Sequence, residues 1–141
     1  MKIAIISAIL AAGAVMPAFA GDVAKGETEF RKCRACHMIK DDAGTDIFKG
    51  GATGPNLFNI VGSGIAGVEG FRFSDGLLAA RKANPDFTWT QDELAAYMTD
   101  PNGWVQAKTG DSNARTKMTF RLNSGQADLA AYLASVSPKA Q

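Results

Sequence analysis

Hydrophobic residues recur at helical spacing near both ends of the chain. A first helix is predicted to run from a cap at Asp22 towards Cys33, and a last helix from a cap at Ser124 to the residues before Pro138. Their apolar faces consist of Val23, Gly26, Phe30 and Cys33 in the first helix, and of Leu129, Tyr132, Leu133 and Val136 in the last. Each helix has one stripe to bury, so we expect the two to pack against each other.

Two shorter helices are predicted in the middle of the chain. One is predicted to be capped by Asp75 and must end before Asn84-Pro85, because the residue preceding a proline disfavours the α conformation. The other opens at Thr90 with Glu93 three residues later, as in a capping box, and is stopped by Asp100-Pro101. Their apolar positions are Leu77, Leu78 and Ala80 in the one, and Leu94, Tyr97 and Met98 in the other.

Glycine-rich stretches separate these helices. Residues 41–54 are rich in Gly, Asp and Thr, and residues 62–70 hold four glycines, so both stretches are predicted loops. We find no internal repeat, low-complexity tract or linker that would divide residues 21–141. The sequence therefore predicts an all-α, single-domain fold with almost no strand.

The first twenty residues have the composition of a secretory leader. Lys2 precedes an uncharged apolar run, residues 3–16, and residues 17–20 end in the small side chains of an Ala-x-Ala cleavage site. The run is shorter than the roughly 20 residues with which a helix crosses a bilayer, which disfavours a retained membrane anchor. We therefore expect residues 1–20 to be a cleaved signal peptide and residues 21–141 to reach the periplasm as one soluble domain.

The charge of the expected mature chain is balanced. Lys2 leaves with the leader, so 14 Lys and Arg residues face 14 Asp and Glu residues. Nucleic-acid-binding proteins normally show a strong basic excess in a clustered patch, so this balance argues against nucleic acid as a partner. Any charged docking surface must come from local asymmetry.

The segment Cys33-Arg34-Ala35-Cys36-His37 carries the chemistry. Two thiols three positions apart, with an imidazole directly after the second, form the attachment signature of c-type haem. Each thiol can add across one haem vinyl group, and the adjoining histidine is then held against the iron as an axial ligand. The sequence thus predicts one covalently attached haem c, tethered by Cys33 and Cys36 and coordinated by His37.

Other uses of a Cys-x-x-Cys pair fit less well. A structural zinc site takes four ligands, whereas the chain has two Cys and one His in total. A thioredoxin-type pair belongs in a βαβ setting, whereas these residues follow a predicted helix. A disulfide between Cys33 and Cys36 would close too small a loop to stabilise much.

The sixth iron ligand must come from elsewhere in the chain. His37 is the only histidine, which makes methionine the best candidate. Two of the five methionines lie in the leader, and Met38 adjoins His37 and cannot easily reach the opposite haem face. Met98 and Met118 remain. Met98 lies in a regular helical stripe, where methionine more often fills a core, whereas Met118 lies in a segment without helical periodicity, so Met118 is favoured.

Taken together, the ordered motifs resemble the class I c-type cytochromes, most closely the larger bacterial cytochrome c2 type, over essentially all of residues 21–141. The matching positions are Cys33 to His37, Thr53 to Leu57, Trp89, Tyr97, Pro101, Thr116 to Phe120, and the pair Gly26/Phe30 with Leu129/Tyr132. This resemblance implies a fold whose helices and loops wrap around the haem, with the N- and C-terminal helices packed together.

The same resemblance assigns roles to individual residues. It implies that Met118 is the sixth ligand and that the carbonyl of Pro55 accepts the second ring N–H of His37, a bond that would fix the imidazole tautomer. The stretches between His37 and Pro55, and between Pro101 and Met118, are longer than in the mitochondrial members, as in the larger bacterial ones.

It also implies an environment for the haem propionates. Trp89 and Thr116 would lie near a propionate, and Tyr97 close to the sulfur of the sixth ligand. An arginine and a tyrosine of the mitochondrial pattern are replaced here by Ser63 and Phe73. Two groups that would bond the propionates are therefore absent.

The function that the resemblance implies is one-electron transfer, not enzymatic catalysis. The donor would be a quinol-oxidising cytochrome bc1-type complex and the acceptor a photosynthetic reaction centre or a terminal oxidase, each docked briefly by a monomer. Lys32, Lys49 and Lys117 are candidates for a cationic ring around the exposed haem edge. The alternative is a peroxidase-like haem enzyme or gas-binding protein with an open sixth position, which would need a distal acid or base that a single histidine cannot supply.

Overall fold

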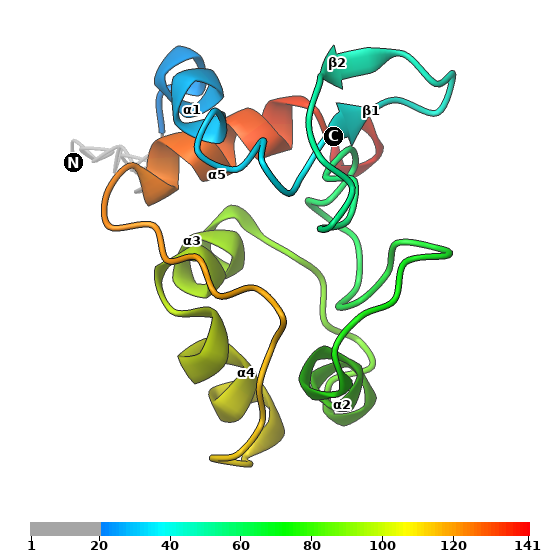
Figure 1. The fold of residues 1–141 in the computed structure, drawn as a ribbon, viewed down its shortest axis with the longest axis vertical. Coiled ribbons are helices and arrows are strands. Elements are labelled where there is room, and N and C mark those ends of the chain that lie inside the picture. The colour runs from blue at the N-terminus through cyan, green and yellow to red at the C-terminus, as the bar shows by residue number, and fades with distance from the viewer. Residues whose placement is uncertain (1–20) are drawn as a thin grey trace, which may run out of the picture.

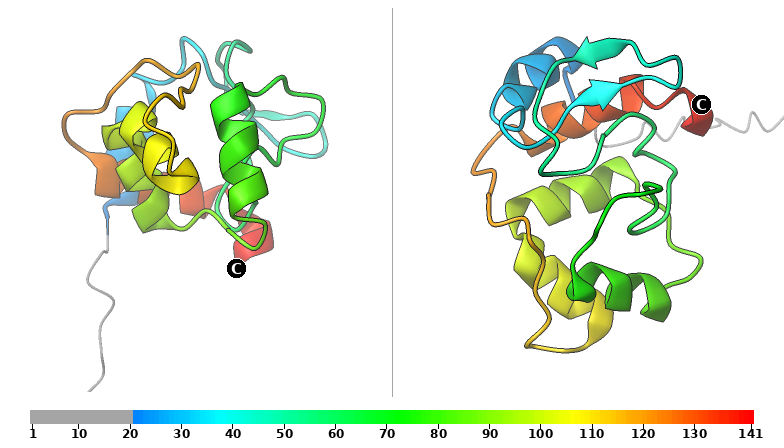
Figure 2. Two further views of the ribbon diagram at one scale, coloured as in Figure 1. Left: turned by 90° about the horizontal axis from the view of Figure 1, so that it is seen from below. Right: turned by 45° about the vertical axis from the view of Figure 1, so that its right-hand side comes forward.

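The computed structural model describes residues 21–141, and within them the regular structure is mostly helical. Its elements are α1 (Val23–Phe30), β1 (Ile39–Lys40), β2 (Asp46–Phe48), α2 (Asp75–Ala83), α3 (Gln91–Thr99), α4 (Pro101–Thr109), α5 (Gln126–Ser135) and the short 3₁₀ helix η1 (Pro138–Ala140). Figure 1 shows α1 and the β1–β2 hairpin beside α5 at one end, α3 in the middle, and α2 and α4 at the other end. The views of Figure 2 agree, with α2 standing beside α4.

The expected contact between the first and last helices is present. Phe30 and Leu129 are fully buried between α1 and α5, and the rings of Phe30 and Tyr132 lie 5.9 Å apart. The helices approach so closely at Gly26 that a Cβ atom there would overlap the Asp128 carbonyl oxygen and lie 2.7 Å from the Cβ of Tyr132. Because there is no space for a Cβ atom, the crossing requires glycine at this position.

Two helix starts confirm the predicted caps. Asp22 caps α1, its carboxylate accepting the Lys25 amide at 3.0 Å, and Thr90 caps α3, its hydroxyl accepting the Glu93 amide at 3.2 Å. The predicted stop at Asn84-Pro85 also holds, because α2 ends at Ala83.

Two other predicted caps were wrong by one residue. The cap of α2 is Ser74, whose hydroxyl accepts the Leu77 amide, and Asp75 is the first helical residue. The residue before α5 is Gly125, with φ of +83° and no capping side chain, so Ser124 does not fill this role. Ser74 has the extended backbone typical of a helix cap, whereas α5 begins after a left-handed glycine without any side-chain cap.

The sequence pattern missed α4 and the hairpin. Pro101 does end α3, yet it also begins α4, because a proline at the first helical position gives up no hydrogen bond; Asp100 caps this helix by accepting the Gly103 amide at 3.1 Å. The strand β2 lies inside the stretch predicted to be a loop and pairs antiparallel with β1. Phe48 anchors it through an edge contact with Phe30, at 4.7 Å between ring centroids.

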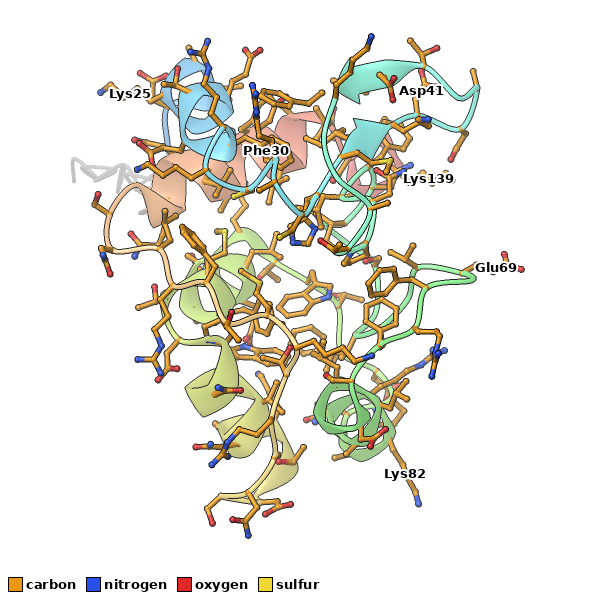
Figure 3. The ribbon with its side chains drawn as sticks, in the orientation of Figure 1. Lys25, Phe30, Asp41, Glu69, Lys82 and Lys139 are labelled. Carbon is orange, nitrogen blue, oxygen red and sulfur yellow. The ribbon has the colours of Figure 1, made fainter. Side chains whose placement is uncertain are left out.

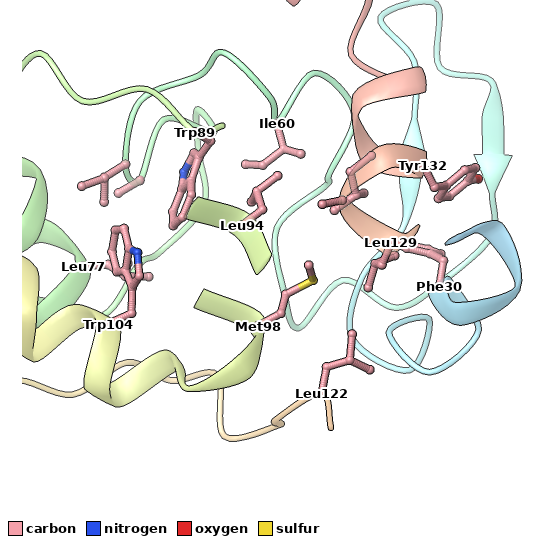
Figure 4. Packing of buried hydrophobic residues seen from close by; sticks show 14 of the residues in the cluster. Phe30, Ile60, Leu77, Trp89, Leu94, Met98, Trp104, Leu122, Leu129 and Tyr132 are labelled. Carbon is pink, nitrogen blue, oxygen red and sulfur yellow. The ribbon is translucent and has the colours of Figure 1, made fainter. Parts of the chain in front are cut away.

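The hydrophobic core runs the length of the molecule. Figure 4 shows Phe30, Leu129 and Tyr132 at one end and Trp89, Trp104 and Leu77 at the other, with Leu94 and Met98 between them. Met98 is 7% exposed and belongs to this core. Within residues 21–141 no helix is long and apolar enough to span a membrane.

Replacing Gly26 with Ala tests the helix crossing. Helix propensity alone would make Gly26→Ala stabilising by about 1 kcal/mol, whereas overpacking against the Asp128 backbone should cost about 1–3 kcal/mol. We expect the free energy of unfolding in denaturant to fall by up to about 2 kcal/mol. The exposed neighbour Glu27 provides the control, because Glu27→Ala should change it by no more than about 0.5 kcal/mol.

Candidate haem site

Both thiols and the imidazole lie on one turn that continues α1. The Cys33 amide donates to the Phe30 carbonyl at 2.8 Å, and the His37 amide donates to the Cys33 carbonyl at 2.9 Å. Cys36 is exposed, Cys33 is half-buried, and the two thiols are not joined in a disulfide. The turn thus presents two separate thiols for attachment and an imidazole next to the second.

A glycine-rich loop packs its backbone onto this turn. The Gly51 amide donates to the Arg34 carbonyl and the Gly54 amide to the Cys36 carbonyl, both at 2.8 Å. A Cβ atom on Gly54 would overlap the His37 ring, lying 2.7 Å from Nδ1. Gly54 therefore leaves room for the imidazole, a requirement that the sequence signalled only through the resemblance.

The hydrogen bond expected between His37 and Pro55 is present. His37 Nδ1 lies 2.8 Å from the Pro55 carbonyl oxygen, an atom that can only accept, so Nδ1 carries the proton. Burial lowers the pKa of His37 below its ordinary value, although the bond to Pro55 opposes this. The ring is thus neutral, and the lone pair of Nε2 remains for a metal.

The environment of Cys33 does not suit a redox-active thiol. Burial, reinforced by the nearby Glu29 carboxylate, raises the pKa of Cys33 to about 11, with Lys32 opposing the shift. A thioredoxin-type nucleophile needs the opposite, a lowered pKa. In addition, residues 21–141 contain no cluster of three or more His, Cys, Asp or Glu side chains that could hold zinc.

A second group of expected site residues gathers around Thr116. Its hydroxyl lies 2.9 Å from the Tyr97 hydroxyl and accepts the Met118 amide at 3.3 Å. The ring of Tyr97 in turn contacts Trp89, at 5.4 Å between centroids. Trp89 and Thr116 are buried and Met118 is partly buried. The structure thus brings Trp89, Tyr97, Thr116 and Met118 together, from α3 and the segments on either side of α3 and α4.

Three neighbours of this group were not found from the sequence. Trp104 stacks on Trp89 with ring centroids 4.7 Å apart and planes 22° apart. Its indole N–H donates to Glu93 Oε2 at 2.7 Å, and Lys108 Nζ donates to Glu93 Oε1 at 2.6 Å. The sequence predicts Glu93 as part of a capping box, but its carboxylate accepts hydrogen bonds from α4 instead. These contacts depend on α4, a helix that the sequence pattern did not predict.

The three candidate docking lysines lie in different settings. Lys32 forms an ion pair with Glu29, Lys117 Nζ donates to the Arg72 carbonyl at 3.2 Å, and Lys49 is exposed. Figure 3 shows charged side chains such as Lys25, Glu69 and Lys82 projecting from different sides of the molecule.

The two replacements of the mitochondrial pattern make contacts within the protein. The Ser63 hydroxyl donates to the Ile60 carbonyl at 2.7 Å, and Phe73 packs edge-on against Phe71 at 4.9 Å. Neither residue supplies the kind of hydrogen-bond donor that the arginine and the tyrosine would.

Comparison with known proteins gives a consistent set of relatives, although no protein-family model matches the chain. Cytochrome c-550 of Paracoccus versutus is 54% identical over 142 aligned positions, covering 99% of this chain and 92% of that protein. Cytochrome c2 of Rhodobacter capsulatus is 44% identical, covering 96% of this chain and 98% of that protein. The X-ray structure of cytochrome c2 from Paracoccus denitrificans matches with a TM-score of 0.84 and 53% identity, covering 85% of this chain and 99% of that one.

The Glu93 cluster predicts a pH-dependent contribution to stability. Burial pushes the pKa of the Glu93 carboxyl up, but the hydrogen bonds from Lys108 and Trp104 and the Lys108 charge outweigh it and hold the pKa below its ordinary value of 4.5. A lowered folded-state pKa gives stability that is present above 4.5 and is lost as the pH falls through the folded value. Glu93→Gln should therefore cost about 1–2 kcal/mol at neutral pH and less at about pH 3.

Denaturant unfolding of the parent protein and of Glu93→Gln, from neutral pH to about pH 3, measures the effect. The control is Asp42→Asn, which removes the carboxylate of an ion pair with Lys139 whose side chains are 71% and 69% exposed. It should change stability little at either pH. An equal cost of Glu93→Gln at both pH values would show that the Glu93 charge is not what stabilises the cluster.

Proposed function

The chain belongs to the class I c-type cytochromes, and we propose that it carries single electrons between membrane redox complexes in the periplasm. Membership follows from its identity of 54% to cytochrome c-550 and 44% to cytochrome c2 over nearly whole chains. With the family come its fold, one covalently attached haem c bound through Cys33 and Cys36, and the role of an electron carrier and not an enzyme.

The residues of the attachment turn fit a c-type haem. Two unbridged thiols and a neutral imidazole stand on one turn, and Gly54 leaves space against the ring. When bound, the haem iron supplies a one-electron ferric/ferrous couple. The Pro55 carbonyl orients the His37 ring and keeps the proton on Nδ1, so that Nε2 can serve as the proximal ligand without any proton transfer.

We assign the sixth ligand to Met118. Its amide is bonded to the buried Thr116 hydroxyl, which fixes the backbone just before the side chain, and Met118 itself is only partly buried. Met98 is instead packed among Leu94 and the other core residues, where its thioether fills space. A thioether opposite an imidazole favours the ferrous state and raises the potential.

The observation that carries the proposal is the hydrogen bond between His37, on the attachment turn, and Pro55, on the loop packed against that turn, with Met118 on a third, separate segment. If both His37 and Met118 bind the iron, this arrangement leaves no coordination position for a substrate. The function it supports is transfer of an electron with little rearrangement.

Export and partners belong to the same proposal. The expected leader, residues 1–20, lies outside the described residues, and its composition supports cleavage after Ala20 and delivery to the periplasm. A monomer would then take electrons from a cytochrome bc1-type complex and pass them to a reaction centre or a terminal oxidase. The balanced charge supports weak, brief docking.

Replacing Met118 with Ala tests the ligand assignment. The ferric protein should lose the weak absorption band at the red end of the spectrum that reports iron–sulfur ligation. Its potential should fall by a substantial part of the roughly 0.8 V range that axial ligands span. Met98→Leu is the matched control, because it removes the other thioether of residues 39–141 while keeping the core filled. Loss of the band in Met98→Leu instead would reassign the ligand.

Electron-transfer kinetics test the partners. We expect rapid oxidation of the ferrous protein by an isolated reaction centre or by a terminal oxidase, with the faster acceptor identifying the partner. Lys49→Glu should slow this reaction about tenfold at low salt and weaken its salt dependence, because Lys49 directly precedes the loop on the attachment turn. Lys82→Glu, the same charge change on the distant end of α2, should have little effect. Equal effects of both variants would contradict docking at the haem edge.

A further inference from the structure

The segment that carries Met118 is long and lacks regular structure. Residues 110–125 form neither helix nor strand. After Met118, the segment is fixed where the Leu122 amide donates to the Met98 carbonyl at the end of α3, at 2.8 Å. From residue 111 to Met118 the backbone makes no hydrogen bond to the backbone of another element, so side chains supply the hydrogen bonds that hold it to the rest of the molecule.

Asn102 supplies that hold. Its Oδ1 accepts the backbone N–H of Thr116 at 3.0 Å, and Thr116 is only 8% exposed. The Tyr97 hydroxyl also contacts Thr116, at 2.9 Å, but it reaches the side chain and not the backbone. The contact from Gln106 to the Ala114 carbonyl is longer, at 3.4 Å, and the Lys117 bond to Arg72 is exposed. The Asn102 bond is therefore the shortest partly buried side-chain tie to the backbone before Met118.

The position of Asn102 suits it for this task. It lies in the first turn of α4, next to Pro101, which is fully buried and fixes the start of the helix. The Asp100 cap holds the same turn through the Gly103 amide. The acceptor oxygen is thus anchored on a rigid element, and it is bonded two residues before the proposed ligand.

We propose that Asn102 is a positioning residue that holds the Met118 loop closed over the iron. This inference rests on the proposed ligation by Met118 and adds a residue outside the motif positions that the chain shares with the cytochrome family. Without Asn102, the Thr116 N–H would remain buried without an acceptor. Opening the loop would let water accept this hydrogen bond, so the free energy of the open state would fall relative to the closed state. The tie shortens the free part of a long loop, which lowers the population of states in which Met118 is detached.

Competition with imidazole measures that population. Imidazole added to the ferric protein binds only when Met118 is displaced, so its apparent affinity is proportional to the fraction of open loop. Asn102→Ala should raise this affinity about tenfold, which corresponds to about 1.4 kcal/mol. Asn102→Asp keeps an acceptor oxygen at the same place and should restore the affinity to within about threefold of the parent protein.

Two further variants separate loop opening from general destabilisation. Gly26→Ala weakens the distant crossing of α1 and α5, and Gln106→Ala removes the long contact from the same helix to the same segment. Both should leave imidazole affinity within about twofold of the parent protein. An increase in Gly26→Ala or Gln106→Ala that equals the one in Asn102→Ala would overturn the inference, as would failure of Asn102→Asp to restore the parent affinity.

The parent protein reports on the underlying ligation separately. Its iron–sulfur band should be present before imidazole is added and should disappear as imidazole binds. A parent protein without that band would refute ligation by Met118 itself, and the inference about Asn102 would fall with it. A normal band with unchanged imidazole affinity in Asn102→Ala would refute only the role of Asn102.

Discussion

The hydrogen bond from the His37 ring to the Pro55 carbonyl is the constraint on which the haem site depends. It fixes which ring nitrogen is protonated and which way the other nitrogen points. The loop that carries Pro55 must therefore lie directly on the attachment turn, and it does so through backbone hydrogen bonds at Gly51 and Gly54. Any side chain at Gly54 would take the space of the imidazole. The position of this one ring thus accounts for the glycine at position 54.

The other side of the site is organised by α3 and α4. Tyr97 on α3 and Asn102 on α4 both bond to Thr116, through its hydroxyl and its amide respectively. Trp104 on α4 stacks on Trp89, so the helix that holds the segment carrying Met118 also supports the aromatic cluster. Glu93 ties the two helices together through Trp104 and Lys108. The long stretch between Pro101 and Met118 is therefore restrained by the hydrogen bonds and aromatic contacts of α4.

The proposed function requires brief encounters with large partners, and the electrostatics of the chain fit that requirement. Its expected mature form has equal numbers of basic and acidic residues, so long-range attraction has to come from the arrangement of charges. Lys32 is already paired with Glu29, which leaves Lys49 and Lys117 as the more available cations beside the site. Exposed charges of this kind influence the rate of encounter more than the strength of the complex.

The sequence by itself determined the features that depend on residues close together in the chain. Cys33, Cys36 and His37 fall on one turn, and the caps at Asp22 and Thr90 follow from local spacing. So do the apolar stripes of α1 and α5, except that Val23, predicted on the buried face of α1, is exposed near the start of the helix. The resemblance added Pro55, Tyr97 and Thr116, whose contacts span 18 or 19 residues along the chain. Only the tertiary structure decided that Pro101 begins a helix, that Trp104 stacks on Trp89 and that Asn102 reaches Thr116. Each of these depends on which segments the folded backbone brings into contact, and no local periodicity encodes that.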